Sequence, residues 1–286
     1  MSTTNIYSFS QPIIVEKPSS SSLSETIRNL ISNAFAPFQQ EYRRWPWSQI
    51  GTIVIVCIGS YTVYKYLPGP YRRYYMLSTK NFSSQYNKAL HVEKETLFNE
   101  LKNVKAREEG RTKIQVVEIG AAHGANMAYY PPNIIELICV EPIREFEVYL
   151  TQTLGRNPHV KCRELLVGGA ENLSVIRDNQ VDAVVSTLTL SSCKNVHQVL
   201  REIRRILKPG GIFLYMENIR SPNPFLAFIQ YLCSPMYKFL FGISLIRNIP
   251  EYIERAHFSG GTTQRIFVAR GIPFLLSPHV SGIARK

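Results

Sequence analysis

The sequence predicts an α/β protein whose sheet is mostly parallel. Apolar, strand-like runs alternate with segments of helical spacing from residue 114 onward. The first run, residues 116–119, leads into a turn of small residues, and the second, residues 137–140, is followed at once by Glu141. Such β-α alternation builds a parallel sheet with helices on both faces and places ligands at the carboxyl ends of the strands. A binding site is therefore expected where these two runs end.

Residues 1–44 are predicted to form a polar tail that contains one amphipathic helix. Residues 1–21 are polar, Ser22-x-x-Glu25 has the form of a capping box, and apolar residues then recur at helical spacing as far as Phe38. This helix either docks onto the folded domain or lies on a membrane surface, although its polar face contains few Lys and Arg residues.

Residues 45–67 are predicted to form a hydrophobic membrane anchor. The segment carries no charge before Lys65, and arginine pairs flank it at 43–44 and 72–73. As a helix it would extend roughly 33 Å, enough to span a bilayer. Its small polar residues also allow insertion into one leaflet, and a buried core helix is the third interpretation. The basic residues that follow it favour a cytosolic C-terminal domain.

Residues 68–113 are expected to connect the anchor to the α/β domain of residues 114–286, with one helix and a charged connection over 80–113. Strands are predicted over 115–119, 136–140, 159–166, 183–188 and 212–216. A short helix after the first strand should stop before Pro131-Pro132, and longer helices are expected over 146–155 and 196–207. Lys208-Pro209-Gly210-Gly211 should make a tight reversal into the last of these strands.

The charge balance is basic, with 33 Lys and Arg against 21 Asp and Glu, a formal net charge of +12. Since these residues are spread along the chain, the plain interpretation is a soluble protein with a generally basic surface. The alternatives are that the basic residues bind an anionic membrane face or nucleic acid. The five cysteines form no C-x-x-C pair, which predicts free, mostly buried thiols and no metal site.

The turn after the first strand is the predicted cofactor site. Small side chains let main-chain N–H groups approach a ligand, and glycine can adopt a positive φ. The candidate residues here are Glu118, Gly120, Ala122, Gly124 and Asn126. Glu141, at the end of the second strand, can accept two hydrogen bonds from a ribose diol. The plainer alternative for Glu118 is that it only braces the turn.

Four motifs stand in the order and spacing of class I S-adenosylmethionine-dependent methyltransferases: the small-residue turn, Glu141, Val181-Asp182-Ala183 and the Lys-Pro-Gly-Gly reversal. The chain resembles this class more than a dehydrogenase, which would carry G-x-G-x-x-G and lack Lys-Pro-Gly-Gly. The resemblance implies a Rossmann-like sheet of seven strands and S-adenosyl-L-methionine as the cofactor. A nucleic-acid methylase is disfavoured, because no Asn/Asp-Pro-Pro-Tyr follows the fourth strand.

Several further motifs resemble the membrane-associated thiol S-methyltransferases, the methyltransferase-like protein 7 family. They are Gly124-Ala125-Asn126 with Tyr130-Pro131-Pro132, residues 186–190, Lys194-Asn195, residues 254–259 and Pro278-His279. The resemblance covers roughly residues 50–286 and leaves residues 1–44 outside. It implies a last strand near 280–284 that pairs antiparallel with 265–268. It also implies a cytosol-facing enzyme on the endoplasmic reticulum or lipid droplets that methylates small lipophilic thiols.

The same resemblance assigns the remaining site residues. Glu141 would hold the ribose hydroxyls, Glu171 and Asn172 would lie by the adenine, and Thr187 would line the floor beneath the sulfonium. Asn126 would cap or contact nearby backbone. The thiol acceptor is itself acidic enough that no strong base is required, so the catalytic base is left unassigned, with His279 and Glu217 as weak candidates. Apolar residues over 225–241 would either wall an acceptor pocket or pack on the sheet.

The chain departs from the family pattern at five positions. In the turn, Ala122 stands where the family has its second motif glycine, Ala121 stands where it usually has cysteine, and His123 replaces a small hydroxyl residue. Elsewhere, Glu141 replaces an aspartate and Asn218 replaces a histidine. His123 is either a ligand contact or, as favoured, a solvent-facing turn residue. Two alternatives to a thiol methyltransferase therefore stay open: a lipid or quinone methyltransferase, and a catalytically silent methyltransferase-like membrane protein.

Overall fold

The computed structural model describes residues 80–106, 110 and 112–286. The expected amphipathic helix over 22–38, the hydrophobic segment 45–67 and the start of the connecting segment lie outside these residues. In the described part of the chain, none of the helices has both the length and the hydropathy needed to cross a membrane.

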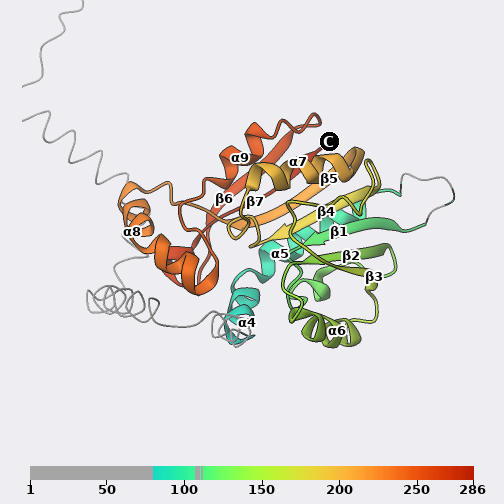
Figure 1. The fold of residues 1–286 in the computed structure, drawn as a ribbon, viewed down its shortest axis with the longest axis horizontal. Coiled ribbons are helices and arrows are strands. Elements are labelled where there is room, and N and C mark those ends of the chain that lie inside the picture. The colour runs from blue at the N-terminus through green and yellow to red at the C-terminus, as the bar shows by residue number, and fades with distance from the viewer. Residues whose placement is uncertain (1–79, 107–109, 111) are drawn as a thin grey trace, which may run out of the picture. The chain divides into compact units, whose positions relative to one another are not determined.

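Seven strands form one sheet in the order β3-β2-β1-β4-β5-β7-β6 (Figure 1). They are β1 (Ile114–Ile119), β2 (Ile135–Glu141), β3 (Lys161–Val167), β4 (Val181–Thr187), β5 (Leu207–Asn218), β6 (Thr262–Val268) and β7 (Pro278–Arg285). The first five strands are parallel, while β7 pairs antiparallel with both β5 and β6. The predicted seven-stranded, mostly parallel sheet and the pairing of its last strand are confirmed.

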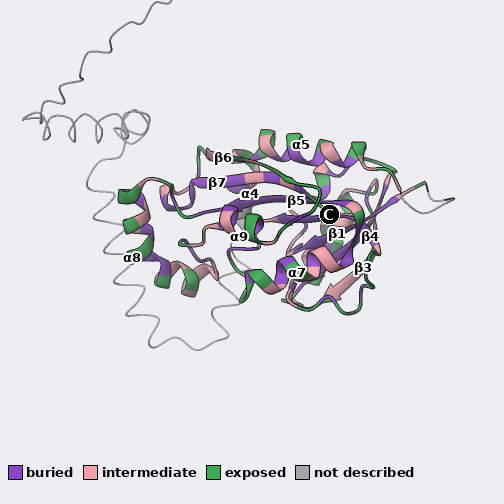
Figure 2. Ribbon diagram, turned by 90° about the horizontal axis from the view of Figure 1, so that it is seen from above, coloured by how far each residue is buried: buried purple, intermediate pink, exposed green. Residues whose placement is uncertain are grey.

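Helices cover both faces of the sheet. They are α4 (Lys80–Ala89), α5 (His91–Asn99), α6 (Phe146–Arg156), α7 (Val196–Ile206), α8 (Pro224–Phe241) and α9 (Ile249–Arg255). Short 3₁₀ turns span Glu100–Asn103, Met127–Tyr129 and Phe274–Leu276. Figure 2 shows α5 on one side of the sheet and α7 on the other. The buried face of α7 shares one apolar core with α9 and with the strands β1, β2, β4 and β5.

Several boundaries differ from the prediction. The single helix expected from Lys80 bends at Leu90, which has φ −106°, but hydrogen bonds from Leu90 N to Tyr86 O and from Lys94 N to Leu90 O bridge the bend. The segment after β1 is only a 3₁₀ turn, because Tyr130 must be extended before proline. Helix α6 passes through Gly155 and ends at Arg156.

The Lys-Pro-Gly-Gly segment is a bulge within β5 rather than a separate reversal. Val181 pairs with Leu207 and Ala183 with Ile212, so residues 208–211 are accommodated opposite Asp182 alone. The buried Asp182 carboxylate accepts from Lys208 Nζ at 3.0 Å and from Gln115 N at 2.9 Å. This carboxylate therefore joins the starts of β1, β4 and β5. It lies at the amino ends of these strands, whereas the predicted site lies at the carboxyl ends.

Candidate active site

The turn that follows β1 has left-handed backbone conformation at alternate positions. The φ angle is 70° at Gly120, 45° at Ala122 and 80° at Gly124. Position 120 requires glycine, since a Cβ there would lie 2.2 Å from Thr189 Oγ1. Ala122 adopts the same left-handed region with a Cβ, at a conformational cost of about 1–2 kcal/mol. The turn therefore keeps its shape although one of its glycines has been replaced.

Glu141, at the end of β2, joins that turn directly. Its Oε2 accepts from Ala122 N and its Oε1 from Ile143 N, both at 3.0 Å. The side chain is largely buried, and burial raises its pKa while the two backbone hydrogen bonds lower it. A carboxylate has about four acceptor sites, so capacity remains for the two hydroxyls of a ribose. The remaining acceptor capacity of Glu141 thus fits the ribose of an adenosine-containing cofactor.

Asn126 is the centre of a buried polar network between the sheet and α5. Its Nδ2 donates to Glu118 Oε1 at 2.8 Å and to Thr187 Oγ1 at 2.7 Å. Its Oδ1 accepts from Lys94 Nζ at 2.7 Å, and Tyr130 Oη donates to Glu118 Oε2 at 2.7 Å. Three predicted site residues are therefore brought together, from β1, β4 and the loop between β1 and β2. Asn126 bonds mainly side chains rather than the backbone.

Two members of this network, Lys94 and Tyr130, were not among the predicted site residues. Tyr130 had a signal, because it belongs to the Tyr-Pro-Pro motif, whereas a lysine in a polar helix is normally solvent-exposed. Lys94 is buried, and desolvation lowers its pKa to about 8 although the charge of Glu118 raises it. Desolvation likewise raises the pKa of Glu118, against the lowering effects of Tyr130, Asn126 and Lys94.

His123 is only partly exposed and its ring nitrogens are buried, which differs from the favoured expectation of a solvent-facing residue. Its ring stacks on Phe146 with centroids 6.0 Å apart, and both ring nitrogens are buried. The backbone carbonyl of His123 accepts from Thr153 Oγ1 at 2.8 Å. Since Phe146 and Thr153 both belong to α6, His123 packs the turn against that helix.

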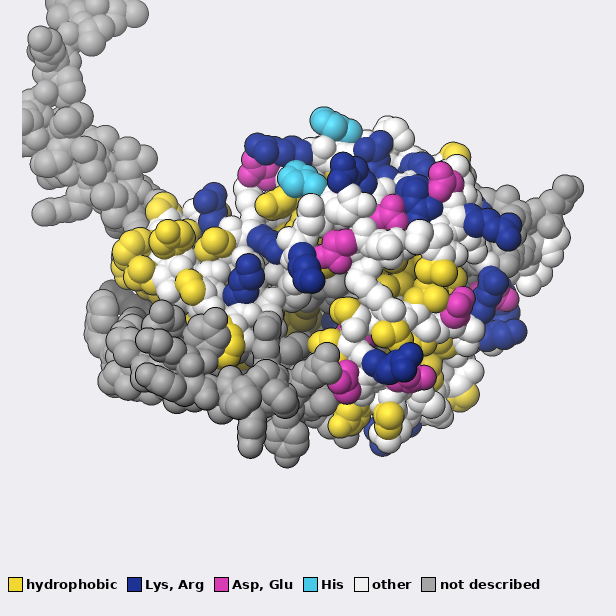
Figure 3. Space-filling view, viewed as in Figure 1, with side chains coloured by type: hydrophobic (Ala, Val, Ile, Leu, Met, Phe, Trp, Pro, Cys, Tyr) yellow, Lys and Arg dark blue, Asp and Glu magenta, His cyan; other side chains and the backbone are white. Residues whose placement is uncertain are grey.

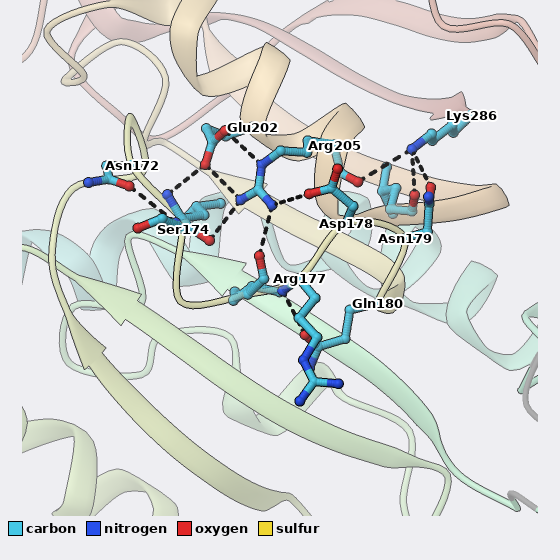
Figure 4. Close-up of polar contacts among 12 residues, drawn as sticks. Asn172, Ser174, Arg177, Asp178, Asn179, Gln180, Glu202, Arg205 and Lys286 are labelled. Atoms are coloured by element: carbon cyan, nitrogen blue, oxygen red, sulfur yellow. Dashed lines mark hydrogen bonds and ion pairs between the residues drawn. The ribbon is translucent and has the colours of Figure 1, made fainter.

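Glu171 and Asn172 lie on the loop between β3 and β4. Glu171 Oε1 accepts from Lys194 N at 2.7 Å, while Asn172 Oδ1 accepts from Ser174 N at 3.1 Å. Arg205 of α7 holds this loop through Leu173 O and Asp178 Oδ1, and it pairs with Glu202 (Figure 4). The loop is thus held firmly against α7, and the adenine role of its two polar residues remains a prediction.

Glu217, near the end of β5, organises the loop that follows β4. Its Oε1 accepts from Ser186 Oγ at 2.7 Å and Thr189 N at 3.1 Å, and its Oε2 accepts from Leu190 N at 3.0 Å. Burial raises the pKa of Glu217 to about 7 in spite of these hydrogen bonds. Thr189 in turn donates to Ile119 O at 3.2 Å. These contacts explain Glu217 as a brace for the loop that packs on Gly120.

His279 pairs with Asn218 where β7 meets the carboxyl end of β5. The ring is completely buried between Tyr86 and Phe267, with centroids 6.0 and 5.6 Å away. Desolvation lowers its pKa to about 4, so the ring is neutral at neutral pH. Nδ1 lies 2.9 Å from Ser277 O and therefore carries the proton, and Nε2 has no hydrogen-bond partner among the described residues. Nε2 is thus an uncommitted acceptor, but the lowered pKa makes it a weak base.

The apolar set expected to wall an acceptor pocket forms α8, but its large side chains divide between two faces. Leu226 and Cys233 are buried, whereas Phe225, Phe228, Tyr231 and Leu232 are exposed. The four exposed side chains point away from the sheet and do not enclose a pocket there. In the described ranges, no three His, Cys, Asp or Glu side chains are grouped to hold a metal ion.

The sheet order, the strained turn and the carboxylate that joins it to β2 together define a class I S-adenosylmethionine-dependent methyltransferase. Residues 117–215 match the methyltransferase domain family. A solved S-adenosylmethionine-dependent methyltransferase from Methanosarcina mazei superposes with a TM-score of 0.50 at 17% identity, covering 62% of this chain and 93% of that one. At that identity the likeness is one of fold.

Curated relatives identify the family more narrowly. Human thiol S-methyltransferase TMT1A is 34% identical over 207 residues, which cover 72% of this chain and 83% of the relative. Rat thiol S-methyltransferase TMT1B is 32% identical over 187 residues, covering 65% of this chain and 74% of the relative. The chain belongs to the thiol S-methyltransferase family. The resemblance drawn from the motifs is confirmed, and S-adenosyl-L-methionine is the cofactor.

Proposed function

We propose that this enzyme transfers the methyl group of S-adenosylmethionine to the sulfur of a small lipophilic thiol. The observation that carries the proposal is the 34% identity to a thiol S-methyltransferase over most of both chains. It is supported by the site, where the turn holds its left-handed conformation and keeps its bond to Glu141 in spite of Ala122. A degraded site would not need to maintain this strained arrangement.

The bound cofactor supplies an electrophilic methyl group on a sulfonium. Glu141 holds the ribose hydroxyls, and the turn 120–124 with the Asn126 network shapes the methionine end. A thiol with a pKa near ~8.5 is several per cent thiolate at neutral pH, so positioning and the exclusion of water do most of the catalytic work. The thiol loses its proton to water when the thiolate forms, since burial lowers the pKa of His279 to about 4 and leaves its Nε2 too weak a base to take that proton.

The acceptor is tested with the purified full-length chain and methyl-labelled cofactor. Three acceptors of matched hydrophobicity are compared: a lipophilic thiol, the alcohol with oxygen in place of sulfur, and a quinol. Label on the thiol alone supports the proposal, while label on the quinol supports the lipid or quinone alternative. If calorimetry detects binding of neither the cofactor nor its demethylated product to the folded chain, the protein is catalytically silent.

We also propose that the chain is anchored to the endoplasmic reticulum membrane or to lipid droplets, with its catalytic domain in the cytosol. The support is the hydrophobic segment 45–67 and the basic residues that follow it. Protease treatment of intact microsomes should digest the domain without detergent. Protection of the domain until detergent is added would contradict this topology.

A further inference from the structure

Helix α8 carries an exposed apolar stripe. Phe225, Phe228, Tyr231 and Leu232 expose 56%, 59%, 66% and 60% of their surface. Their spacing of three or four residues puts them on one side of the helix. They are four of the ten large hydrophobic side chains that are exposed in the described part of the chain. Such a concentration marks an interaction surface rather than scattered surface apolarity.

The outward orientation of this stripe is enforced by a buried glutamine. Gln230, on the opposite side of α8, is completely buried, and its Oε1 accepts from Ser221 N at 2.7 Å. Its Nε2 donates to Leu275 O at 2.8 Å and to Ile219 O at 3.2 Å. Turning the helix to bury its aromatic residues would break all three hydrogen bonds. The helix therefore holds Gln230 inward with the buried Leu226 and Cys233 and leaves its four aromatic and aliphatic stripe residues outward, so apolar residues occupy both sides of it.

A basic pocket of about 460 Å³ continues from the last turns of α8. Its lining includes the cations Arg220, Lys238, Arg247 and Arg255 and one carboxylate, Glu251, which pairs with Arg255 at 2.5 Å. Arg247 is committed to the carbonyls of Leu190 and Cys193. Arg220 and Lys238 are exposed, and neither pairs with a carboxylate among the described residues. Two cations are thus available to an anionic group entering the pocket.

The stripe and the pocket form one surface, because Lys238 belongs to α8 and also lines the pocket. Figure 3 shows hydrophobic side chains gathered over α8 with Lys and Arg side chains beside them. Ile246, also in the pocket lining, is 41% exposed and extends the apolar area. Aromatic side chains beside unpaired basic residues are the composition that binds the interface of an anionic bilayer.

We propose that this surface, the α8 stripe with the Arg220–Lys238 pocket, docks the catalytic domain onto an anionic membrane, with a lipid phosphate held in the pocket. The inference rests on the proposed membrane association for its occupant but is independent of methyl transfer. It gives the domain a contact of its own, apart from residues 45–67. Docking would orient one defined face of the enzyme toward a lipophilic acceptor dissolved in the bilayer.

The test uses the full chain in vesicles, with a single tryptophan as reporter. The sequence has only Trp45 and Trp47, so both are replaced by Phe and the reporter is introduced as Phe228→Trp. The matched control is Val175→Trp, since Val175 is 73% exposed on the loop between β3 and β4. Lipids brominated in their acyl chains should quench the reporter at 228 in vesicles containing phosphatidylserine and leave the control at 175 unquenched. Equal quenching at both positions, or none at 228, would overturn the proposal.

The pocket is tested by Arg220→Gln with Lys238→Gln in the same reporter background. Each cation near an anionic surface contributes about 1 kcal/mol, so the ratio of docked to undocked domain should fall roughly thirty-fold in phosphatidylserine vesicles. The control Arg163→Gln with Arg177→Gln removes two exposed cations elsewhere and should leave quenching unchanged. A third measurement asks whether the tryptophan at 228 is shielded from a water-soluble quencher in the absence of lipid. Shielding that increases with protein concentration would identify a second copy of the chain as the occupant and reject the membrane. Shielding without lipid that disappears when residues 1–44 are deleted would identify the chain's own N-terminal segment as the occupant, and this result would also reject the membrane.

Discussion

The Glu141 carboxylate accepts a hydrogen bond from the Ala122 amide at 3.0 Å, and this bond joins the end of β2 to the turn after β1. The residue proposed to bind ribose is thus also a support for the turn that is proposed to shape the methionine end of the site. The end of β2 and the turn after β1 are thus held together by this hydrogen bond. A change at either residue is therefore expected to affect the other.

Replacing Glu141 with Ala should weaken cofactor binding at least about a hundred-fold, because the two charge-assisted hydrogen bonds that we propose Glu141 accepts from the ribose would be lost. It should also lower the free energy of unfolding by about 1–3 kcal/mol, since the amides of Ala122 and Ile143 lose their acceptor. Titration calorimetry and urea unfolding measure the two effects. Unchanged cofactor affinity in a folded variant would remove Glu141 from the site.

Replacing Ala122 with Gly should stabilise the fold by up to about 1 kcal/mol. The left-handed conformation at φ 45° costs alanine about 1–2 kcal/mol, which glycine does not have to overcome. Part of this stabilisation is offset because glycine loses more conformational entropy than alanine on folding. Cofactor affinity should be retained or increased. Urea unfolding of Ala122→Gly beside Ala122→Val provides the comparison, since a β-branched residue should be strongly destabilising. A less stable glycine variant would mean that this turn is not strained.

Replacing Asn126 with Ala should lower the free energy of unfolding by about 3 kcal/mol or more, because it leaves Lys94, Glu118 and Thr187 without a shared buried partner. Asn172→Ala is the matched control, since Asn172 is exposed and bonds only within its own loop. That control should change stability by less than about 0.5 kcal/mol. Similar losses in both variants would show that the buried network contributes little.

Glu217 should make stability depend on pH between about 4.5 and 7. Burial raises its pKa from 4.5 to about 7, so within this window the folded chain keeps a proton that the unfolded chain has lost. Its contribution to stability is complete below pH 4.5 and is lost as the pH rises through 7, by about 3 kcal/mol in total. The difference in unfolding free energy between the parent and Glu217→Gln should shrink with rising pH, as urea titrations across the window would measure. A pH-independent difference would place the carboxyl pKa near its ordinary value.

Much of the fold was predictable because its signals are local. The β-branched runs identify β1, β2 and β4, and the helical spacing of Val196, Val199, Leu200 and Ile203 identifies α7, whose predicted inner face is buried. Predictions failed where a neighbour in space decides the boundary. Residues 208–211 look like a turn by composition, but pairing of β5 with Val181 of β4 extends the strand through them.

The sequence by itself determined the fold class, the positions of the parallel strands along the chain and the acidic residues at the strand ends, because periodicity and motif spacing act over short stretches of chain. Only the tertiary structure decided which of those residues meet. Lys94 enters the site from a helix 32 residues before Asn126, and Gln230 turns α8 outward through contact with Leu275, 45 residues later. Such contacts come from packing distant segments around one sheet, and no local pattern encodes them. The same packing exposes the aromatic stripe of α8 that its hydrophobic composition alone would have placed in the core.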